Sequence, residues 1–531
     1  MSNKNFGEPW EGKIERIREN LREGRYALED GIFPIVKELV QNAEDARATR
    51  LLIALDDGLP DAQHELLRGP ALLAINDGGF DAANSRAIRE MGLSSKAADS
   101  SSIGKFGLGM KSVFHLGEVF FFVAVSEDGR RIDADIRNPW SADTGGLHPD
   151  WDDFSERDIH AVETRVRSLF GIGKWFCLWV PLRTRAQADG VDPIEPFFPG
   201  EQALDELLGA VQASQVSALL PLLSHLQTIA LAVGQERNFT CRVDGESSRR
   251  SPVDMLSATP FREARSFGGK ITSTGPGLEQ KAVFAGEECR PGDEQLDHLA
   301  RHEKWPRRFA TDPATGRSVQ VAEKASPHVA VCCVASKALD AGGQVRLQWA
   351  VFLPLGKPET IPVPHCSWSF DLFLHGWFFP NSGRTAVESL DANEKSHPPD
   401  ASGSAAVRHR WNHRLARIGT LPLIPTTLAA IARSCEWDDR TTASITLALH
   451  QSRLMLGFRT EVCERDMWMR RLTPEGGGSW QVVPTGTPFF TVPDADPEAR
   501  VMTVFPALRE LAAKHVIVFQ SSPRLTASAP Q

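Results

Sequence analysis

Three short motifs follow one another in the first third of the chain, and their order limits the possible folds more than any other feature. The first, IVKELVQNAEDARA, follows Pro34 and has apolar residues at helical spacing. At about 100° per residue, Glu38, Asn42 and Asp45 fall in a narrow arc beside the apolar side. Two carboxylates and an amide therefore face one spot at the edge of the core. A solvated helix face is the alternative interpretation.

The second motif, NDGGF, directly follows the apolar strand ALLAI. It places Asp77 at a strand end, ahead of Gly78 and Gly79. A carboxylate in this position can lie at the floor of a pocket and accept a hydrogen bond from an exocyclic amino group, such as that of adenine. The same tripeptide is also common in ordinary turns.

The third motif is the glycine-rich segment IGKFGLGMKS, which runs into an expected helix near Gly109. Its glycines allow the backbone to approach an anion closely, and the helix would direct free N–H groups at phosphates. Lys96 and Lys105 would add positive charge. The segment is neither a Walker A loop nor a GxGxxG loop that follows a strand.

In this order, ELVQNAEDA, NDGGF, GLSSK and IGKFGLGMKSVFHL resemble the N, G1 and G2 boxes of the GHKL ATPases, and they look most like the sacsin-like subfamily. The resemblance covers roughly residues 25 to 395. It implies a Bergerat-type α/β sandwich at the N-terminus, followed by an α/β domain like the transducer domains of this class. It also implies that the cofactors are ATP and Mg²⁺.

The resemblance implies a role for each matching position. Glu38 matches the general base that activates water, Asn42 the Mg²⁺ ligand, and Asp77 the carboxylate that reads adenine. The segment from Ser94 to Lys96 falls in the lid that closes over nucleotide. The positions expected to bind nucleotide are Asn42, Asp45, Asp77, Gly79, Met91, Ser94, Ser95, Lys96, Gly104, Lys105, Phe106, Gly107, Leu108 and Gly109.

The sequence departs from the family pattern at two places. Asp81 stands where the second glycine of the G1 box is usual, and Trp175 and Phe176 stand where a Gly-Thr pair often supports the adenine-reading carboxylate. We therefore expect a water molecule or another side chain to assist Asp77.

The region after the first domain adds to the resemblance. LLPLLSHLQTIAL and the segment from VFLPLGK to PNSGRTAV are similar to the corresponding parts of sacsin-like chains. Arg384 is the candidate for the basic residue that reaches the γ-phosphate in related ATPases, and a surface arginine is the alternative interpretation. His375 is interpreted as a structural residue rather than a catalyst.

Alternating helix and strand patterns predict an α/β (α+β) multidomain protein. The expected divisions are an ATP-binding domain over 1–190, a transducer-like α/β domain over 191–395 and a mixed region over 396–531 that ends in a disordered tail. Segments 185–200 and 393–404 are the candidate linkers. The most apolar stretch, 216–233, is interrupted by Pro221 and is interpreted as a buried helix.

The net charge, the cysteine spacing and the N-terminal sequence argue against several classes of protein. A formal net charge of -9 argues against a protein that coats nucleic acid. The eight cysteines show no C-x-x-C pair, so reduced cytosolic thiols are expected. The polar N-terminus has no secretion signal. We expect a cytoplasmic protein without a membrane span.

The favoured interpretation is an ATPase of chaperone type, in which ATP and Mg²⁺ drive closure of a lid and a domain to act on a protein client or partner. A nucleic-acid-associated defence or repair ATPase is one alternative, since basic and aromatic residues cluster at 304–308, 408–411 and 467–471. A nucleotide-sensing scaffold that does not hydrolyse ATP is another. The oligomeric state is left open.

Overall fold

The computed structural model describes residues 10–24, 33–89, 109–141, 145–190, 192–196, 198–199, 210–233, 236–245, 247–248, 264–275, 278–311, 318–323, 325–338, 342–364, 366–381, 385–390, 403–438, 441, 444–445, 448–449, 452–456, 467–472, 478–483, 489–492 and 516–519. The chain forms two compact units. Unit 1 comprises Met1–Val243, Thr272–Glu279 and Arg307–Lys324, and unit 2 comprises the rest. Both contain helices and β-sheet, which confirms an α/β multidomain protein.

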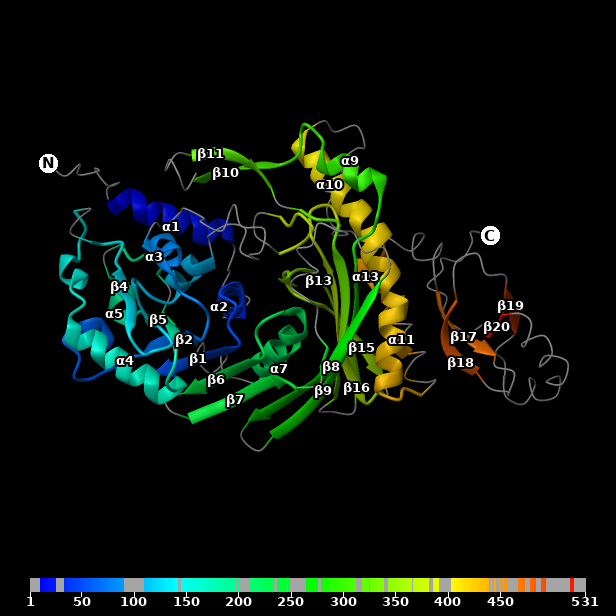
Figure 1. The fold of residues 1–531 in the computed structure, drawn as a ribbon, viewed down its shortest axis with the longest axis horizontal. Helices are drawn as coiled ribbons and strands as arrows, with labels where there is room; N and C mark the ends of the chain where they lie inside the picture. Colours follow the sequence, from blue (N-terminus) through cyan, green and yellow to red (C-terminus); the bar gives the residue numbers. More distant parts are fainter. Residues whose placement is uncertain are drawn as a thin grey trace. The chain divides into compact units, whose positions relative to one another are not determined.

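Unit 1 holds the three motifs (Figure 1, blue to cyan and green). Its longer helices are α1 (Trp10–Gly24), α2 (Phe33–Asp45), α3 (Ala82–Arg89), α4 (Glu156–Phe170) and α7 (Ala210–Leu219), and its short ones are α5 (Arg185–Ala188), η2 (Glu65–Leu67), η4 (Gly109–His115), η6 (Pro149–Asp152) and η7 (Leu220–Leu222). Its strands are β1 (Arg50–Asp56), β2 (Ala71–Asn76), β3 (Phe120–Val125), β4 (Arg131–Arg137), β5 (Trp175–Pro181), β6 (Thr228–Val233), β7 (Glu236–Val243), β10 (Arg307–Thr311) and β11 (Ser318–Ala322).

The sheet of unit 1 has the order β7-β6-β1-β2-β5-β3-β4. Strand β1 is antiparallel to β2, with Leu51 opposite Asn76, and parallel to β6. All residues of β2 and β3 are buried. Their continuous apolar sequences suit strands that are covered on both faces. The strand expected at ALLAI is confirmed as β2, and the apolar runs LLIAL, FFFVAV and WFCLWVPL form β1, β3 and β5.

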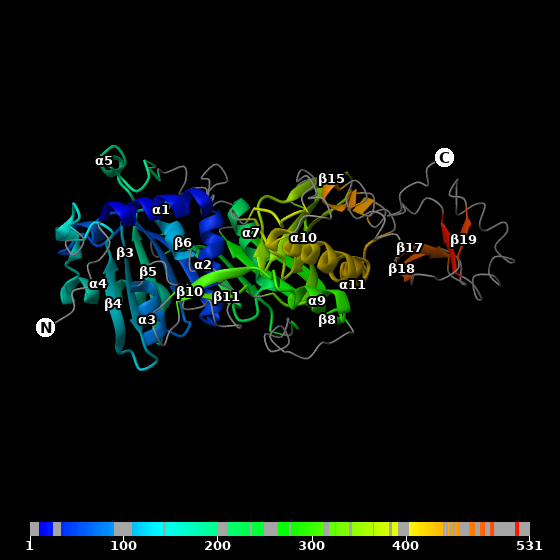
Figure 2. The ribbon, with the colours of Figure 1, turned by 90° about the horizontal axis from the view of Figure 1, so that it is seen from above.

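Helices cover both faces of this sheet. The contacts of two consecutive residues of β3, which point to opposite faces, show which helices lie on each face. Phe122 lies near Phe80, which stands two residues before α3, and the guanidinium of Arg89 on α3 lies 5.6 Å from the ring centroid of Phe122. Its neighbour Phe121 instead meets the ring of Phe154, which precedes α4. We call the first side, which carries α2 and α3, the α2 face, and the second the α4 face (Figure 2).

One expectation for unit 1 is wrong. The apolar stretch 216–233 is not a single buried helix, because α7 ends at Leu219, the short turn η7 follows, and Thr228–Val233 forms β6. Pro221 cannot continue the hydrogen-bonding ladder of a helix. Since β6 pairs with β1, unit 1 extends beyond residue 190. The predicted domain boundaries themselves stay predictions.

Unit 2 contains further β-strands and a helical layer. Its strands are β8 (Arg265–Gly275) and β9 (Leu278–Cys289), whose linked ends belong to unit 1, with β12 (Val329–Lys337), β13 (Gly342–Val351), β14 (Leu353–Pro354), β15 (Glu359–Pro364) and β16 (Trp368–Gly376). Its helices are α9 (Glu294–Ala300), α10 (Ser404–Leu415), the π-helical turn η8 (Ala416–Thr420), η9 (Leu421–Leu423), α11 (Ile424–Ser434) and α13 (Arg453–Leu456). Four further strands, β17 (Met467–Leu472), β18 (Gly478–Val483), β19 (Phe489–Val492) and β20 (Val516–Phe519), form a separate sheet.

The helical stretch Ser404–Ser434 is the one candidate for a membrane span within the described ranges, by length and composition only. Of its most apolar window, 67% is buried inside the structure, and α11 packs against β12. A core helix of a globular domain passes the same test, so this is weak evidence for a membrane. The predicted disordered tail lies outside the described residues.

Candidate functional site

Helix α2 carries the predicted polar arc beside its apolar side. Glu38 is buried, with 8% of its surface exposed, whereas Asn42 and Asp45 are half-buried. The Asn42 backbone carbonyl accepts the Ala46 N–H at 3.1 Å, but its side chain makes no hydrogen bond to any described residue. The structure therefore offers an uncommitted amide oxygen one turn after a buried carboxylate.

Glu44 holds the same helix in place from the opposite flank of the apolar stripe. Its carboxylate accepts the backbone N–H groups of Ser224, His225 and Leu226 at 2.7 to 3.1 Å, and its Oε1 lies 3.0 Å from Nδ1 of His225. Burial alone would raise the pKa of Glu44, but these hydrogen bonds, with that from His225 the largest, hold it below its ordinary value. Glu44 thus fixes α2 to the turn that leads into β6.

The turn of the second motif docks on the end of α2. The Gly79 N–H donates to the Ala46 carbonyl at 2.9 Å. A Cβ on Gly78 would lie 2.5 Å from the Ala46 Cβ, so only glycine fits there. Gly79 is exposed, and a Cβ on it would meet nothing within 4 Å. Close packing therefore requires the first glycine and leaves open space at the second.

Asp77 binds the start of β1. Its Oδ1 accepts the N–H groups of Thr49 at 2.7 Å and Arg50 at 2.9 Å, and its Oδ2 accepts the Thr49 hydroxyl at 2.7 Å and Nε of Arg50 at 3.3 Å. Burial works to raise the pKa of Asp77, yet these donors, led by the Thr49 hydroxyl, hold it below its ordinary value. The side chain that bonds Asp77 here is that of Thr49, while the role of Asp77 toward adenine stays a prediction.

The two positions that depart from the family pattern have clear structural roles. Asp81 caps α3, because its Oδ1 accepts the Asn84 N–H at 2.8 Å while its own N–H donates to the Asn84 side chain at 3.1 Å. Phe176 stacks on Phe80 with ring centroids 5.2 Å apart and planes 15° from parallel. Trp175 is buried.

Helix α3 is bound to strand β4 by a charged cluster. Arg89 bonds Oδ1 of Asp133 at 2.7 Å and Oδ2 of Asp135 at 2.8 Å, and Ser85 also bonds Asp133 at 2.5 Å. Hydrogen bonding to Arg89 lowers the pKa of Asp133. The end of α3, which leads toward the predicted lid, is thus fixed to the sheet.

The third motif ends in the 3₁₀ helix η4, which packs against both α2 and α1. The fully buried Arg183 bonds Oε1 of Glu118 at 2.5 Å and the carbonyls of Phe114 and His115 at 2.8 and 2.9 Å. Charged hydrogen bonds therefore fix the end of this segment from within the core. Gly109 is its first described residue, so the helix predicted near Gly109 is present as a 3₁₀ helix.

Many of the predicted nucleotide-binding positions lie outside the described residues: Met91, Ser94, Ser95, Lys96, Gly104, Lys105, Phe106, Gly107, Leu108 and the sensor candidate Arg384. The structure places α2, which carries Glu38, Asn42 and Asp45, against η4 and against the turn at Gly79. The Asp77 side chain instead bonds the start of β1. Sequence patterns gave no signal for Thr49, Glu44 or Arg183, because each acts through contacts with residues far away in the sequence.

The donor set at α2 suits a hard cation that is bound mainly by phosphates. Among the described residues, no group of three or more His, Cys, Asp and Glu side chains could hold a metal ion alone. Mg²⁺ in nucleotide sites needs only one or two protein oxygens, since phosphates and water supply the remainder. The uncommitted oxygen of Asn42 fits that requirement.

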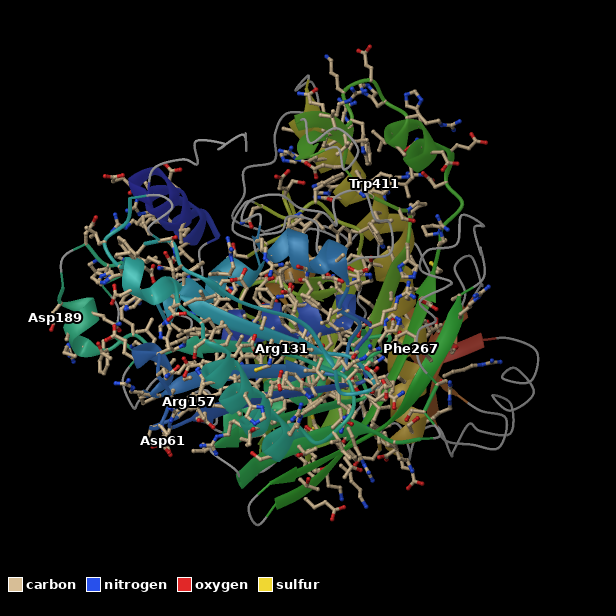
Figure 3. All side chains as sticks on the ribbon, turned by 60° about the vertical axis from the view of Figure 1, so that its left-hand side comes forward. Asp61, Arg131, Arg157, Asp189, Phe267 and Trp411 are labelled. Atoms are coloured by element: carbon tan, nitrogen blue, oxygen red, sulfur yellow. The ribbon has the colours of Figure 1, made fainter. Side chains whose placement is uncertain are left out.

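Two other sequence expectations concern residues of unit 2. His375 is fully buried, and its Nδ1 accepts the Phe352 N–H at 3.0 Å, which is a structural contact. In the cluster at 408–411, Trp411 is buried on α10 (Figure 3) and donates to the Trp377 carbonyl at 2.9 Å, while Arg408 bonds Glu388 at 2.7 Å. This cluster is built into unit 2.

The described cysteines are buried and unbridged. Burial raises the pKa of Cys241 to about 12 and that of Cys435 to about 11. Because the thiolate is the reactive form, these thiols are inert at neutral pH.

Comparison with known proteins gives an N-terminal relationship. The Sacsin domain family matches residues 12–136, from α1 to β4. Human sacsin is 26% identical over 207 residues, which are 37% of this chain and 4% of sacsin. The chain thus matches a small fraction of the length of that relative. The N-terminal part of the chain is therefore related to the Sacsin domain.

Proposed function

We propose that unit 1 binds ATP with Mg²⁺ and hydrolyses it, as the resemblance to GHKL ATPases implies. The observation that carries this proposal is the meeting of the three motifs at α2: the Gly78–Gly79 turn docks on its end and η4 packs along it. Segments distant in sequence thus pack against the helix that carries Glu38 and Asn42.

The residues have separate roles in this proposal. Asn42 would hold Mg²⁺ through its amide oxygen, and the metal would neutralise phosphate charge. Glu38, buried one turn earlier, would orient and deprotonate the attacking water. The glycine-rich segment before η4 would bind phosphates through its backbone N–H groups. Glu44 and Arg183 position α2 and η4 without touching the ligand.

We further propose that nucleotide binding and hydrolysis drive a chaperone-like cycle of closure and opening that acts on a protein client or partner. Two observations support this, the relationship of residues 12–136 to the Sacsin domain and the resemblance to chaperones of the GHKL class. Arg384 would report the γ-phosphate to the second region. Action in the cytoplasm belongs to the same proposal.

Hydrolysis is tested by phosphate release from Mg-ATP. Wild-type protein should turn over, and Glu38→Ala should lose about 10²–10⁴-fold in rate, as expected when a general base is removed. Asp57→Ala, at an exposed acidic residue after β1, should match the wild type. If Glu38→Ala hydrolyses ATP at the wild-type rate, the protein is a nucleotide-binding scaffold or uses another base.

A further inference from the structure

Asn76 and Asp77 are consecutive at the end of β2, and their side chains turn to opposite sides of the sheet. Asn76 lies on the α2 face: its Oδ1 accepts the Gly78 N–H at 2.9 Å, beside the close approach of Gly78 to Ala46, which directly follows α2. Asp77 instead meets Arg50, whose guanidinium lies 4.5 Å from the ring centroid of Phe170 on α4. Only Asn76 therefore shares a face with Glu38 and Asn42.

The hydrogen bonds of Asp77 leave it little capacity for a ligand. An ionised carboxylate has about four lone-pair sites. Four donors from Thr49 and Arg50 already occupy them. An adenine amino group could reach Asp77 only by displacing one of these contacts.

Asn76 has the capacity that Asp77 lacks. Its Oδ1 keeps one lone pair after accepting the Gly78 N–H, and its Nδ2 group donates no hydrogen bond to any residue in the described part of the chain. It therefore presents one acceptor and one donor side by side. That pair matches adenine, whose amino group donates and whose adjacent ring nitrogen accepts, as in the bidentate pairing of Asn with adenine.

An aromatic ring lies directly across the strand pair from Asn76. Phe176 of β5 is its register partner, so the two side chains project from the same face. Phe176 is half-buried and is stacked on half-buried Phe80. Aromatic rings of this kind stabilise a planar base by stacking.

We propose that Asn76 reads the adenine base by donating and accepting one hydrogen bond each, with Phe176 as the stacking platform, while Asp77 is structural. This inference rests on the proposed ATP binding. It also explains why Trp175 and Phe176 replace the usual Gly-Thr pair. That pair supports a carboxylate that reads adenine, and no such support is needed when Asn76 reads the base.

The test compares Mg-ATP with Mg-tripolyphosphate, which has the phosphates but no base, by calorimetric titration. Asn76→Ser keeps a neutral oxygen for the Gly78 N–H and removes the amide donor. We expect Asn76→Ser and Phe176→Leu to weaken ATP binding at least about tenfold. Neither should change tripolyphosphate binding, which also reports that each variant is folded. Asp77→Asn should lower the melting temperature and leave the ratio of the two affinities unchanged.

Two results would overturn the inference and leave the proposed function standing: Asn76→Ser binding ATP as tightly as the wild type, or Asp77→Asn losing ATP but keeping tripolyphosphate. If the wild-type protein binds neither ligand, the proposed function fails and the inference falls with it.

Discussion

Thr49 donates twice to Asp77, through its backbone N–H to Oδ1 and through its hydroxyl to Oδ2, both at 2.7 Å. Thr49 directly precedes β1 and Asp77 directly follows β2, so this pair closes the ends of two central strands. Thr49→Val removes the hydroxyl and keeps the size and the backbone donor. Because Thr49 is exposed, we expect a loss of about 1 kcal/mol in the free energy of unfolding, measured by urea titration. An unchanged midpoint would mean that water replaces the hydroxyl at no cost.

Alanine substitutions at the two glycines of the turn should have very different effects on the free energy of unfolding. Gly78→Ala places a Cβ against Ala46 and should lower the free energy of unfolding by about 1–3 kcal/mol, as overpacking does. Gly79→Ala, whose Cβ meets nothing within 4 Å, is the matched control and should change stability by less than about 0.5 kcal/mol. Equal effects at both positions would show that the turn does not dock on α2 as described.

Glu44 should give the fold a specific dependence on pH. Its pKa is lowered in the folded state, so its stabilising contribution is complete above the unfolded pKa of about 4.3 and is lost as pH falls through the folded value. Glu44→Gln removes the charge that four donors share and should cost about 2 kcal/mol at pH 7. The difference from the wild type should shrink below about pH 4. A constant difference down to pH 3 would contradict a depressed pKa.

Arg183 should be essential to unit 1. Arg183→Met leaves Glu118 buried without its charged partner, a change that typically costs about 3–5 kcal/mol. Arg183→Met combined with Glu118→Gln should recover part of that loss, because the buried charge is also removed. Chemical denaturation of both variants measures the difference. No recovery in the double variant would assign the loss to the carbonyl contacts of Arg183 instead.

The identity of the partner class can be tested through turnover. The net charge is -9, and the cluster at 408–411 is held by burial and an ion pair. We therefore expect ATPase turnover to be indifferent to DNA and RNA at physiological salt. A several-fold stimulation by either nucleic acid would favour the defence or repair alternative.

The sequence was sufficient to predict the regular elements near the site. Apolar runs mark β1, β2, β3 and β5, and helical spacing marks α2, because burial on both faces or on one side leaves a direct pattern in the chain. The prediction of one helix over 216–233 was wrong, because an apolar run that is buried in a core has no periodicity that distinguishes a strand from a helix.

Side-chain orientation at the strand end could not be predicted. Asn76 and Asp77 are both plausible ligands in sequence, and only the register of β2 against β1 and β5 shows which one faces α2. The partners Thr49, Glu44 and Arg183 were equally hidden, since long-range contacts leave no local pattern.

Binding of Mg-ATP by α2 and the motifs around it is tested by calorimetric titration of the wild type and of Asn42→Ala. Wild-type protein should bind ATP with Mg²⁺, and Asn42→Ala should weaken this binding at least about tenfold. In EDTA, where the metal contact is absent, the two proteins should bind ATP equally. Absence of ATP binding by the wild type would contradict the proposed ATP site, and an equal loss with Mg²⁺ and in EDTA would contradict the proposed metal contact of Asn42.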